Sequence, residues 1–405
     1  MQVYIGIDWS EKKHDAVFVN EAAAVLAIVT FEHTPQGLAQ LESVRRDLDV
    51  DPQAIMVGLE TAHNLLIDYL WARNYTQVYV VPPSVVKGSR QRYRQSGART
   101  DQSDAELLAN LLRTDRHRLQ PWGPDSLLTR QLRSKISLHI HLTRSCVRLS
   151  NRLRAVLLRY YPAALEVFYS LASPITLEFI QAFPTPQDAA TLSFEAFQHF
   201  ARHHKHARPQ QLPARYARLQ AAQIAASPDT VLVCQGEAIT LAALLLTTMQ
   251  AKKANTHALS ALFAQHPDQA IFASLPGTGD FLQPGLLVKF GDDRRRFPTP
   301  GSLQALAGTC PVTDQSGKRK VIRFRRACDR DFRNIAQQWA RSSLKKSVWA
   351  NTYYQQVRPG CRSDNHAYRC LANRWLAIAW KLWQTKQPYD EAYHMQQRLK
   401  RAKPK

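Results

Sequence analysis

The sequence predicts an α/β domain followed by a mainly helical remainder, and three observations lead to this fold class. Short apolar segments separated by polar turns fill about the first 80 residues, as strands and short helices do. Longer segments follow in which apolar residues recur three or four positions apart, as in helices. The chain has 405 residues, 45 % of them hydrophobic, which is enough for two or three domains with real cores. A disordered basic protein is therefore excluded.

The order of the predicted N-terminal elements points to one fold. Strands are expected at Val3–Asp8, Ala16–Asn20, Val25–Phe31, Ala54–Glu60 and Gln77–Val81, with helices over Pro35–Leu48 and about 63–73. A basic loop over about 84–99 leads into a further helix that begins near Thr100. Three strands, then alternating helices and strands, is the order of the ribonuclease-H-like α/β fold.

Residues 124–160 are predicted to form one long helix. A strict alternation of four and three residues gives it a heptad seam, formed by Leu128, Leu132, Lys135, His139, Leu142, Cys146, Leu149, Leu153, Val156 and Tyr160. We interpret the seam as a coiled coil that joins copies of the chain. An ordinary core helix is the alternative.

The rest of the chain changes character twice. Residues 161–270 are expected to be mostly helical, whereas glycine, proline and arginine punctuate residues 271–334 before helices resume to about 385. The predicted domains are 1–120, 121–160 for the coiled-coil helix, 161–270 for a helical connector, 271–390, and a frayed basic tail at 391–405.

The positive net charge of the chain indicates an acidic binding partner. Lys and Arg number 54 against 32 Asp and Glu, which gives a formal net charge of +22. The basic residues are interleaved with Tyr and Phe in several separate segments, a pattern that suits phosphate contact and base stacking. We therefore predict a nucleic acid rather than a membrane or an acidic protein.

Compartment and cysteine use agree with an intracellular role. The longest apolar run, residues 239–248, is too short to cross a bilayer, and we expect neither a membrane span nor a secretory signal at the N-terminus. The six cysteines contain no Cys-x-x-Cys pair, so reduced cytoplasmic thiols are predicted, with no disulfide framework and no zinc ribbon.

Two predicted strands end in an acidic residue. Asp8 ends the first and Glu60 the fourth, and each follows a glycine two positions earlier on the same strand face, Gly6 and Gly58. If the strands are neighbours, the two carboxylates converge over a floor without side chains that leaves space for an ion. The alternative is that both are ordinary polar residues at strand ends.

A second pair of acids opens the helix after the basic loop. Thr100 is a good N-cap, and Asp101 and Asp104 fall in the first turn, where the helix dipole alone could explain them. Residues three apart also share a face, so the pair could help Asp8 and Glu60 to ligate Mg²⁺. Such ions assist phosphoryl transfer. The basic residues just before the acids could carry a phosphodiester strand to them; they are Lys87, Arg90, Arg92, Tyr93, Arg94 and Arg99.

A second group of motifs lies in the C-terminal part. Pro276-Gly277-Thr278-Gly279 resembles the turn of a helix-hairpin-helix, whose backbone N–H groups can approach a phosphate. Ser316-Gly317 follows, with cations on its C-terminal side, and such a serine could attack phosphorus. Most Ser-Gly pairs are turns, so the residues alone leave this open. Further nucleic-acid contacts are predicted at Lys318, Arg319, Arg323, Phe324 and Arg325.

The order and spacing of these motifs resemble the transposases of the insertion-sequence 110 family, DEDD-type serine recombinases guided by a bridge RNA. Their RuvC-like half opens with a Gly-Ile-Asp strand, as Gly6-Ile7-Asp8 does here, and continues with a strand-terminal Glu and an Asp-x-x-Asp pair. Their transposase half has a Pro-Gly-x-Gly turn and an Ala-Gly-x-x-Pro segment before Ser-Gly, which match 276–279, 307–311 and 316–317.

The resemblance implies a mechanism. The four acids Asp8, Glu60, Asp101 and Asp104 would hold Mg²⁺, and Ser316 would form a covalent phosphoserine link to DNA. The acids of one subunit and the serine of another would form a composite site in a dimer or tetramer. A structured RNA would pair with donor and target DNA. A RuvC-like nuclease that uses water, and a nucleic-acid-binding protein without enzymatic activity, are the alternatives.

Overall fold

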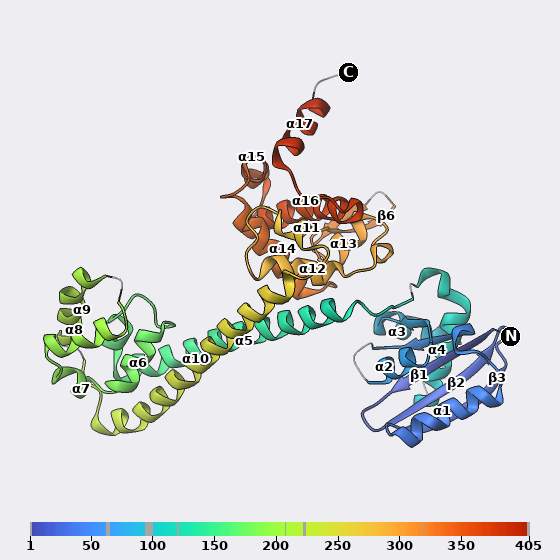
Figure 1. Cartoon of the computed structure of the whole chain (residues 1–405), viewed down its shortest axis with the longest axis horizontal. Helices are drawn as coiled ribbons and strands as arrows, with labels where there is room; N and C mark the ends of the chain where they lie inside the picture. The colour runs from blue at the N-terminus through green and yellow to red at the C-terminus, as the bar shows by residue number, and fades with distance from the viewer. Residues whose placement is uncertain are drawn as a thin grey trace. The chain divides into compact units, whose positions relative to one another are not determined.

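The computed structural model describes residues 2–61, 65–93, 100–119, 121–206, 208–221, 224–317 and 319–402. The chain divides into two compact units, Met1–Pro124 and Asp125–Lys405 (Figure 1). The second unit contains both of the segments that the sequence analysis separates at about residue 270.

The first unit is built on a five-stranded sheet with the order β3-β2-β1-β4-β5. Its strands are β1 (Val3–Trp9), β2 (Lys13–Asn20), β3 (Val25–Glu32), β4 (Ile55–Leu59) and β5 (Gln77–Val80). β1, β2 and β3 pair antiparallel, and β1, β4 and β5 pair parallel. The five predicted strands are confirmed, and the mixed sheet is consistent with a RuvC-like domain.

Helices cover both faces of this sheet. They are α1 (Pro35–Asp47), α2 (Leu65–Ala72), α3 (Pro83–Tyr93) and α4 (Asp101–Asp115). One core joins Ile5 and Val57 to α1 and α2, and the other joins Tyr4 and Met56 to α4. Successive strand residues point to opposite faces, so alternate residues of each strand contribute to the two cores.

The predicted basic loop over 84–99 is wrong for its first half, because Pro83–Tyr93 is the helix α3. Only Val86 of this helix is buried, so it has almost no apolar periodicity by which to recognise it. It is secured instead by ion pairs from its basic residues to α4.

Two long antiparallel helices, α5 (Leu127–Tyr160) and α10 (Pro228–Phe263), run through the second unit (Figure 1). The Asn255 side chain donates to the Lys135 carbonyl at 3.0 Å, and Arg152 donates to Glu237 at 2.6 Å. The predicted seam is thus packed against α10 of the same chain, which the sequence analysis did not pair with it. His139 is buried there beside Thr256, which explains a polar residue in the seam.

α10 is, among the residues described, the one helix long and apolar enough to cross a membrane by length and composition. Core helices of soluble proteins pass the same test, so this is weak support for a membrane span. Residues 239–248 lie within α10, and the helix packs along α5.

Short helices pack around the C-terminal end of α5. They are α6 (Pro174–Ala182), α7 (Pro186–Ala190), α8 (Phe194–His203) and α9 (Leu212–Gln220). Their core contains Phe168, Phe179 and Phe197, whose rings contact one another, together with Tyr160 of α5.

The C-terminal part is helical apart from one hairpin. Its helices are α11 (Gln269–Ala273), α12 (Leu282–Phe290), α13 (Pro300–Leu306), α14 (Arg330–Ser343), α15 (Val348–Val357), α16 (Asp364–Thr385) and α17 (Glu391–Ala402). The hairpin consists of β6 (Val312–Ser316) and β7 (Arg319–Arg323). Three fully buried tryptophans, Trp339, Trp375 and Trp383, centre the core.

The expectation of a frayed tail is wrong for Glu391–Ala402, which form α17. A carboxylate oxygen of Glu391 accepts hydrogen bonds from the Ser347 hydroxyl at 2.8 Å and from the Trp349 backbone N–H at 3.1 Å. These bonds cap the start of α15 and hold the tail against the core.

Candidate active site

The structure confirms that the two acid-bearing strands are neighbours. β1 and β4 pair parallel, with Gly6 opposite Gly58 and Ile7 opposite Leu59. Asp8 and Glu60 are the next residue on each strand path, and both are half-buried. Adjacent strands lie about 4.8 Å apart. The two carboxylates therefore start from neighbouring positions at the same edge of the sheet.

The glycines before these acids do not leave room for an ion, which corrects the prediction. A methyl group on Gly6 would overlap the carbonyl oxygen of Ala105 and lie 2.5 Å from the Ala109 nitrogen. One on Gly58 would lie 3.1 Å from a methyl carbon of Leu112. The glycine floor exists because α4 packs directly on the strand backbone.

The direction of α4 brings its first turn to the end of the sheet that carries Asp8 and Glu60, which we call the acid edge. Gly6 faces Ala105 and Ala109, whereas Met56, near the start of β4, contacts Arg116 just beyond the helix, at 3.5 Å. The helix therefore runs opposite to β1 and β4. Its N-terminus, with Asp101 and Asp104, lies at the end where Asp8 and Glu60 lie.

The predicted N-cap of this helix is confirmed. The Thr100 hydroxyl accepts from the Ser103 N–H at 3.2 Å, and the Ser103 hydroxyl accepts from the Thr100 N–H at 3.1 Å. This reciprocal capping box fixes the first turn. Within that turn Asp101 is exposed and Asp104 is buried.

Two of the basic residues of α3, Arg90 and Arg92, pair with α4. Arg90 makes a two-pronged ion pair with Asp104, with nitrogen–oxygen distances of 3.3 and 3.1 Å, and Arg92 pairs with Asp115 at 2.9 Å. The Tyr93 hydroxyl bonds that of Thr114 at 2.9 Å. These three predicted nucleic-acid contacts are thus engaged with the protein, and Lys87 is exposed. Arg94 and Arg99 lie outside the described residues.

The donor chemistry of the four acids suits Mg²⁺, because all of their ligand atoms are carboxylate oxygens. The acids are not drawn tightly together, however. Among the described residues, only Cys361, His366 and Cys370 form a trio of His, Cys, Asp or Glu side chains with ligand atoms within 4.8 Å of one another. Arg90 also holds Asp104.

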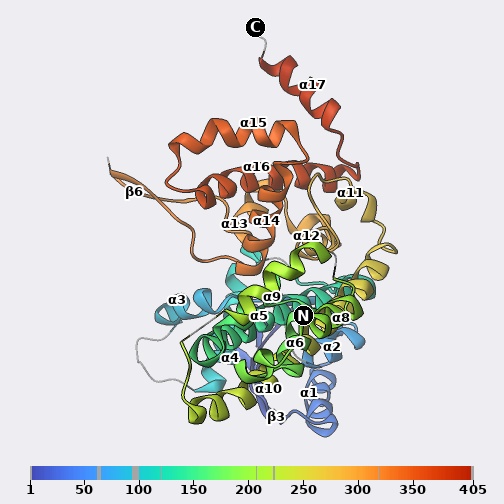
Figure 2. The ribbon, with the colours of Figure 1, turned by 90° about the vertical axis from the view of Figure 1, so that its left-hand side faces the viewer.

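The β6–β7 hairpin projects from the C-terminal part of the chain (Figure 2). Ser316 is the last residue of β6 and pairs with Arg319 across the turn. Gly317 has a φ of +54°, a left-handed conformation that favours glycine, and nothing lies within 4 Å of the position of its missing side chain. Ser316 and Arg319 are exposed, and Arg323 pairs with Asp314 across the strands at 3.1 Å. Lys318 lies outside the described residues. The serine is therefore open to a large substrate.

The glycine turn before α12 serves packing more than phosphate binding. Gly277 has a φ of +76°, and a side chain there would lie 2.6 Å from the backbone of Ser342 and Ser343 in α14. The Trp339 indole donates to the Pro276 carbonyl at 3.0 Å. α14 fills the space where a side chain on Gly277 would lie, so this glycine is required for packing, and its approach to a phosphate stays a prediction. Gly279 alone is exposed with open space around it.

A cationic groove borders the hairpin, and the sequence analysis found only part of it. The Phe324 ring, 45 % exposed, contacts the guanidinium groups of Arg333 at 4.9 Å and Arg369 at 4.7 Å. The groove has a volume of about 600 Å³ and is lined by Phe324, Arg326, Arg330, Arg333, Asn334, Gln337, Asn365 and Arg369. Arg325, predicted as a contact, is half-buried. Of the arginines that the sequence analysis missed, Arg330 and Arg333 lie on one polar face of α14 and Arg369 lies on α16. In sequence these faces look like any solvated helix face.

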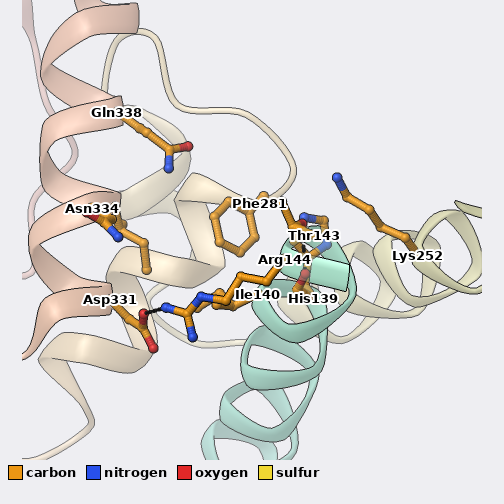
Figure 3. A pocket seen from close by; sticks show the side chains of 10 residues that line it. His139, Ile140, Thr143, Arg144, Lys252, Phe281, Asp331, Asn334 and Gln338 are labelled. Carbon is orange, nitrogen blue, oxygen red and sulfur yellow. Dashed lines mark hydrogen bonds and ion pairs between the residues drawn. The ribbon is translucent and has the colours of Figure 1, made fainter. Parts of the chain in front are cut away.

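A smaller pocket of about 270 Å³ lies where α5, α10, α12 and α14 meet (Figure 3). The His139 ring stacks on Phe281 with their centres 4.4 Å apart, and Arg144 pairs with Asp331. Burial, together with the nearby Lys252, lowers the pKa of His139, so the ring is neutral at pH 7. The pocket is a junction between helices.

Comparison with known proteins now identifies the class. Residues 5–162 match the DEDD transposase model of the IS110 family, and residues 269–355 match the model described as transposase of the IS116/IS110/IS902 family. Together these matches span more than half of the chain. The protein belongs to the IS110 family of transposases.

Two individual relatives match over nearly the whole length of the chain, and a third matches over about two thirds of it. The IS117 mini-circle protein of Streptomyces coelicolor, described as a transposase, is 29 % identical over 96 % of this chain and 96 % of its own. The 42 kDa protein of the insertion element IS900 of Mycobacterium paratuberculosis is 24 % identical over 94 % of this chain and 95 % of its own. The 43.6 kDa protein of the insertion element IS110 of Streptomyces coelicolor is 24 % identical over 69 % of each chain.

Proposed function

We propose that this transposase cuts and rejoins DNA through a covalent link to Ser316. The observation that carries the proposal is the placement of Ser316, exposed at the tip of a hairpin whose other end leads into a cationic groove at Phe324, in a chain of this family. A nucleophile for duplex or branched DNA must be accessible to a bulky substrate, and a hairpin tip meets that need.

The covalent step conserves the number of phosphodiester bonds. The Ser316 oxygen forms a bond to a DNA phosphorus, the bond from phosphorus to one deoxyribose oxygen breaks, and the hydroxyl proton leaves as the released oxygen gains one. Attack by a hydroxyl of another DNA end reverses the step and frees the serine. Arg319, across the turn from Ser316, is suited to stabilise charge on the phosphoryl oxygens.

The acid edge of the first unit would hold Mg²⁺ through Asp8, Glu60, Asp101 and Asp104. Bound Mg²⁺ supplies neutralisation of phosphate charge during the transfer. The residues around these acids position them: α4 is packed on Gly6, and Thr100 caps its first turn. Release of Asp104 from Arg90 would accompany metal loading.

The cationic groove is suited to a nucleic-acid strand. Its arginines would pair with phosphates, and Phe324, flanked by two guanidinium groups, offers a ring on which a base can stack. A net charge of +22 fits contact with both DNA and a structured guide RNA. We place this activity in the cytoplasm, at nucleoid DNA.

A dimer or tetramer would bring the two sets of catalytic groups together. Exposed apolar side chains along α5 and α10, among them Leu138, Val147 and Leu244, support contact with a second copy. In such an assembly the acids of one subunit would serve the serine of another.

The test is to trap the covalent link. The full chain, its RNA and end-labelled DNA carrying the element's termini are incubated with Mg²⁺ and separated under denaturing conditions. Wild-type protein should carry label, Ser316→Ala should carry none, and Thr313→Ala, another exposed hydroxyl on the same hairpin, should behave as wild type. A labelled adduct with Ser316→Ala would overturn the proposal. Cleavage without any adduct would instead support a nuclease that uses water.

A further inference from the structure

We propose that Cys361, His366 and Cys370 form a binding site for Zn²⁺ at the start of α16. Their ligand atoms all lie within 4.8 Å of one another, and all three residues are half-buried. His366 and Cys370 are one helical turn apart on α16, so their side chains share a face. Cys361 joins them from the connection between α15 and α16.

The donor set selects the metal. Two thiolates and an imidazole are the ligands of zinc rather than of Mg²⁺ or Ca²⁺, and Zn²⁺ favours a tetrahedral arrangement of four donors. Three protein ligands leave one position for water. The two thiols lose their protons on binding, so a neutral zinc–dithiolate centre replaces two thiols and a free ion.

The backbone that carries the ligands is held in place by other bonds. Arg358 pairs with Asp364 at the first turn of α16 and donates to the carbonyl of Cys361 at 3.2 Å. The Tyr354 hydroxyl donates to Asp364 at 3.0 Å, and Ser363 caps the helix. The three ligands are therefore presented by a fixed loop and a capped helix turn, which reduces the entropy that metal binding must overcome.

The position of the site suggests its role. Arg369, next to Cys370 on α16, is one of the two guanidinium groups on Phe324, and Asn365, next to His366, lines the same groove. Zinc would secure the end of α16 that carries these groove residues. This role, though not the metal site itself, rests on the proposed nucleic-acid function.

The experiment measures metal directly. The full chain, purified with a thiol reductant and dialysed against Zn²⁺ and then buffer, is analysed for bound metal by mass spectrometry. About one zinc per chain is expected for wild type. Cys361→Ser and Cys370→Ser should each lose most of it, whereas Cys328→Ser, a cysteine outside the trio, should retain it. Ser316→Ala should also retain zinc, which separates this result from the fate of the proposed recombination.

A spectroscopic readout identifies the ligands. Substitution of Co²⁺ should give the visible absorption of thiolate-bound cobalt in wild type and in Cys328→Ser, but not in the double variant Cys361→Ser, Cys370→Ser. Circular dichroism checks that each variant is folded, and His366→Ala provides a second, less disruptive test. Absence of stoichiometric zinc in wild type, zinc unaffected by all three substitutions, or a Cys361–Cys370 disulfide in the reduced preparation would overturn the proposal.

Discussion

The acid edge of the first unit and the serine hairpin of the second are built in opposite ways. Asp8 and Glu60 extend from paired strands of a central sheet, and α4 lies directly on the backbone beneath them. Ser316 sits on two strands that pair only with each other, with mostly exposed side chains. An isolated two-stranded hairpin is only marginally stable in water.

The two regions differ in which contacts determine the positions of their side chains. The position of the acids is determined by packing within their own unit. The position of the serine is determined by a short, exposed turn, so packing within its own unit constrains it far less.

The largest effect is expected from mixing two inactive variants. Asp8→Asn removes a proposed metal ligand and Ser316→Ala removes the proposed nucleophile, so each should abolish strand joining alone. If the site is composite, an equimolar mixture should regain a measurable fraction of wild-type joining, because some assemblies pair an intact acid edge with an intact serine. Joining is measured on labelled element ends. A mixture as inactive as its components would argue that both groups act within one chain.

Gly6→Ala should strongly destabilise the first unit. The added methyl group overlaps the backbone of α4, so the helix must move, and we expect a loss of about 3 kcal/mol or more. Chemical denaturation of the full chain, followed by circular dichroism, measures it. Gly88→Ala is the matched control, because it lies in α3 with open space around it and should be neutral or slightly stabilising. Equal stability of the two variants would contradict the close packing of α4.

Asp292→Asn should weaken the second unit in a pH-dependent way. Burial alone would raise the pKa of Asp292, but hydrogen bonds from His266, Thr129 and Ser126 keep it well below its ordinary value. An Asp with a lowered pKa stabilises the fold above about pH 4, and this contribution fades as pH falls further. We expect the variant to lose about 2 kcal/mol at pH 7 and to unfold with a flatter acid dependence.

The control for this prediction is Asp280→Asn, since Asp280 is exposed. Thermal unfolding at pH 7 and at pH 3 separates the variants. A difference between wild type and Asp292→Asn that stays constant over this range would rule out the assigned role of the carboxylate.

Arg330→Gln should weaken nucleic-acid binding about tenfold at moderate salt. Arg330 lines the groove beside Phe324 and is exposed, so we expect it to contact one phosphate. The slope of log affinity against log salt should fall by about one. Arg295→Gln, an exposed arginine outside the groove that pairs with Asp293, is the control. An unchanged slope would remove Arg330 from the interface.

Gly317→Ala should have the smallest effect. The left-handed conformation strains any other residue by about 1 kcal/mol, but the site is open, so only the hairpin should loosen. Adduct formation should fall several-fold while the melting temperature of the chain stays constant. Gly360→Ala, which also has open space around it, controls for glycine replacement in a loop.

Patterns local in sequence predicted much of this molecule. The strands, the cap at Thr100 and the long helix α5 follow from alternation, capping chemistry and heptad spacing, all of which act over a few residues. The position of Asp8 and Glu60 at the ends of neighbouring strands also followed, because parallel neighbours align their ends.

Contacts between distant segments were not predictable in this way. Glycine spacing could not reveal that α4, about 100 residues away, fills the space over Gly6. The same holds for Arg90, whose pairing with Asp104 depends on how α3 lies against α4, and for α10 as the partner of the seam. The groove was not predictable, because Arg369 contacts Phe324 only once α16 has packed next to the end of β7.

The direct packing of α4 against the backbone of β1 at Gly6 has one more consequence. No side chain of Gly6 lies between β1 and α4, so the two elements cannot shift slightly by repacking side chains there. We therefore expect them to separate completely or to stay together. We expect amide hydrogens of β1 and α4 to exchange with solvent at a common rate, as a single cooperative block. The acid edge would then be either fully assembled or absent, with no partly formed state in which a metal ion could bind in the wrong geometry.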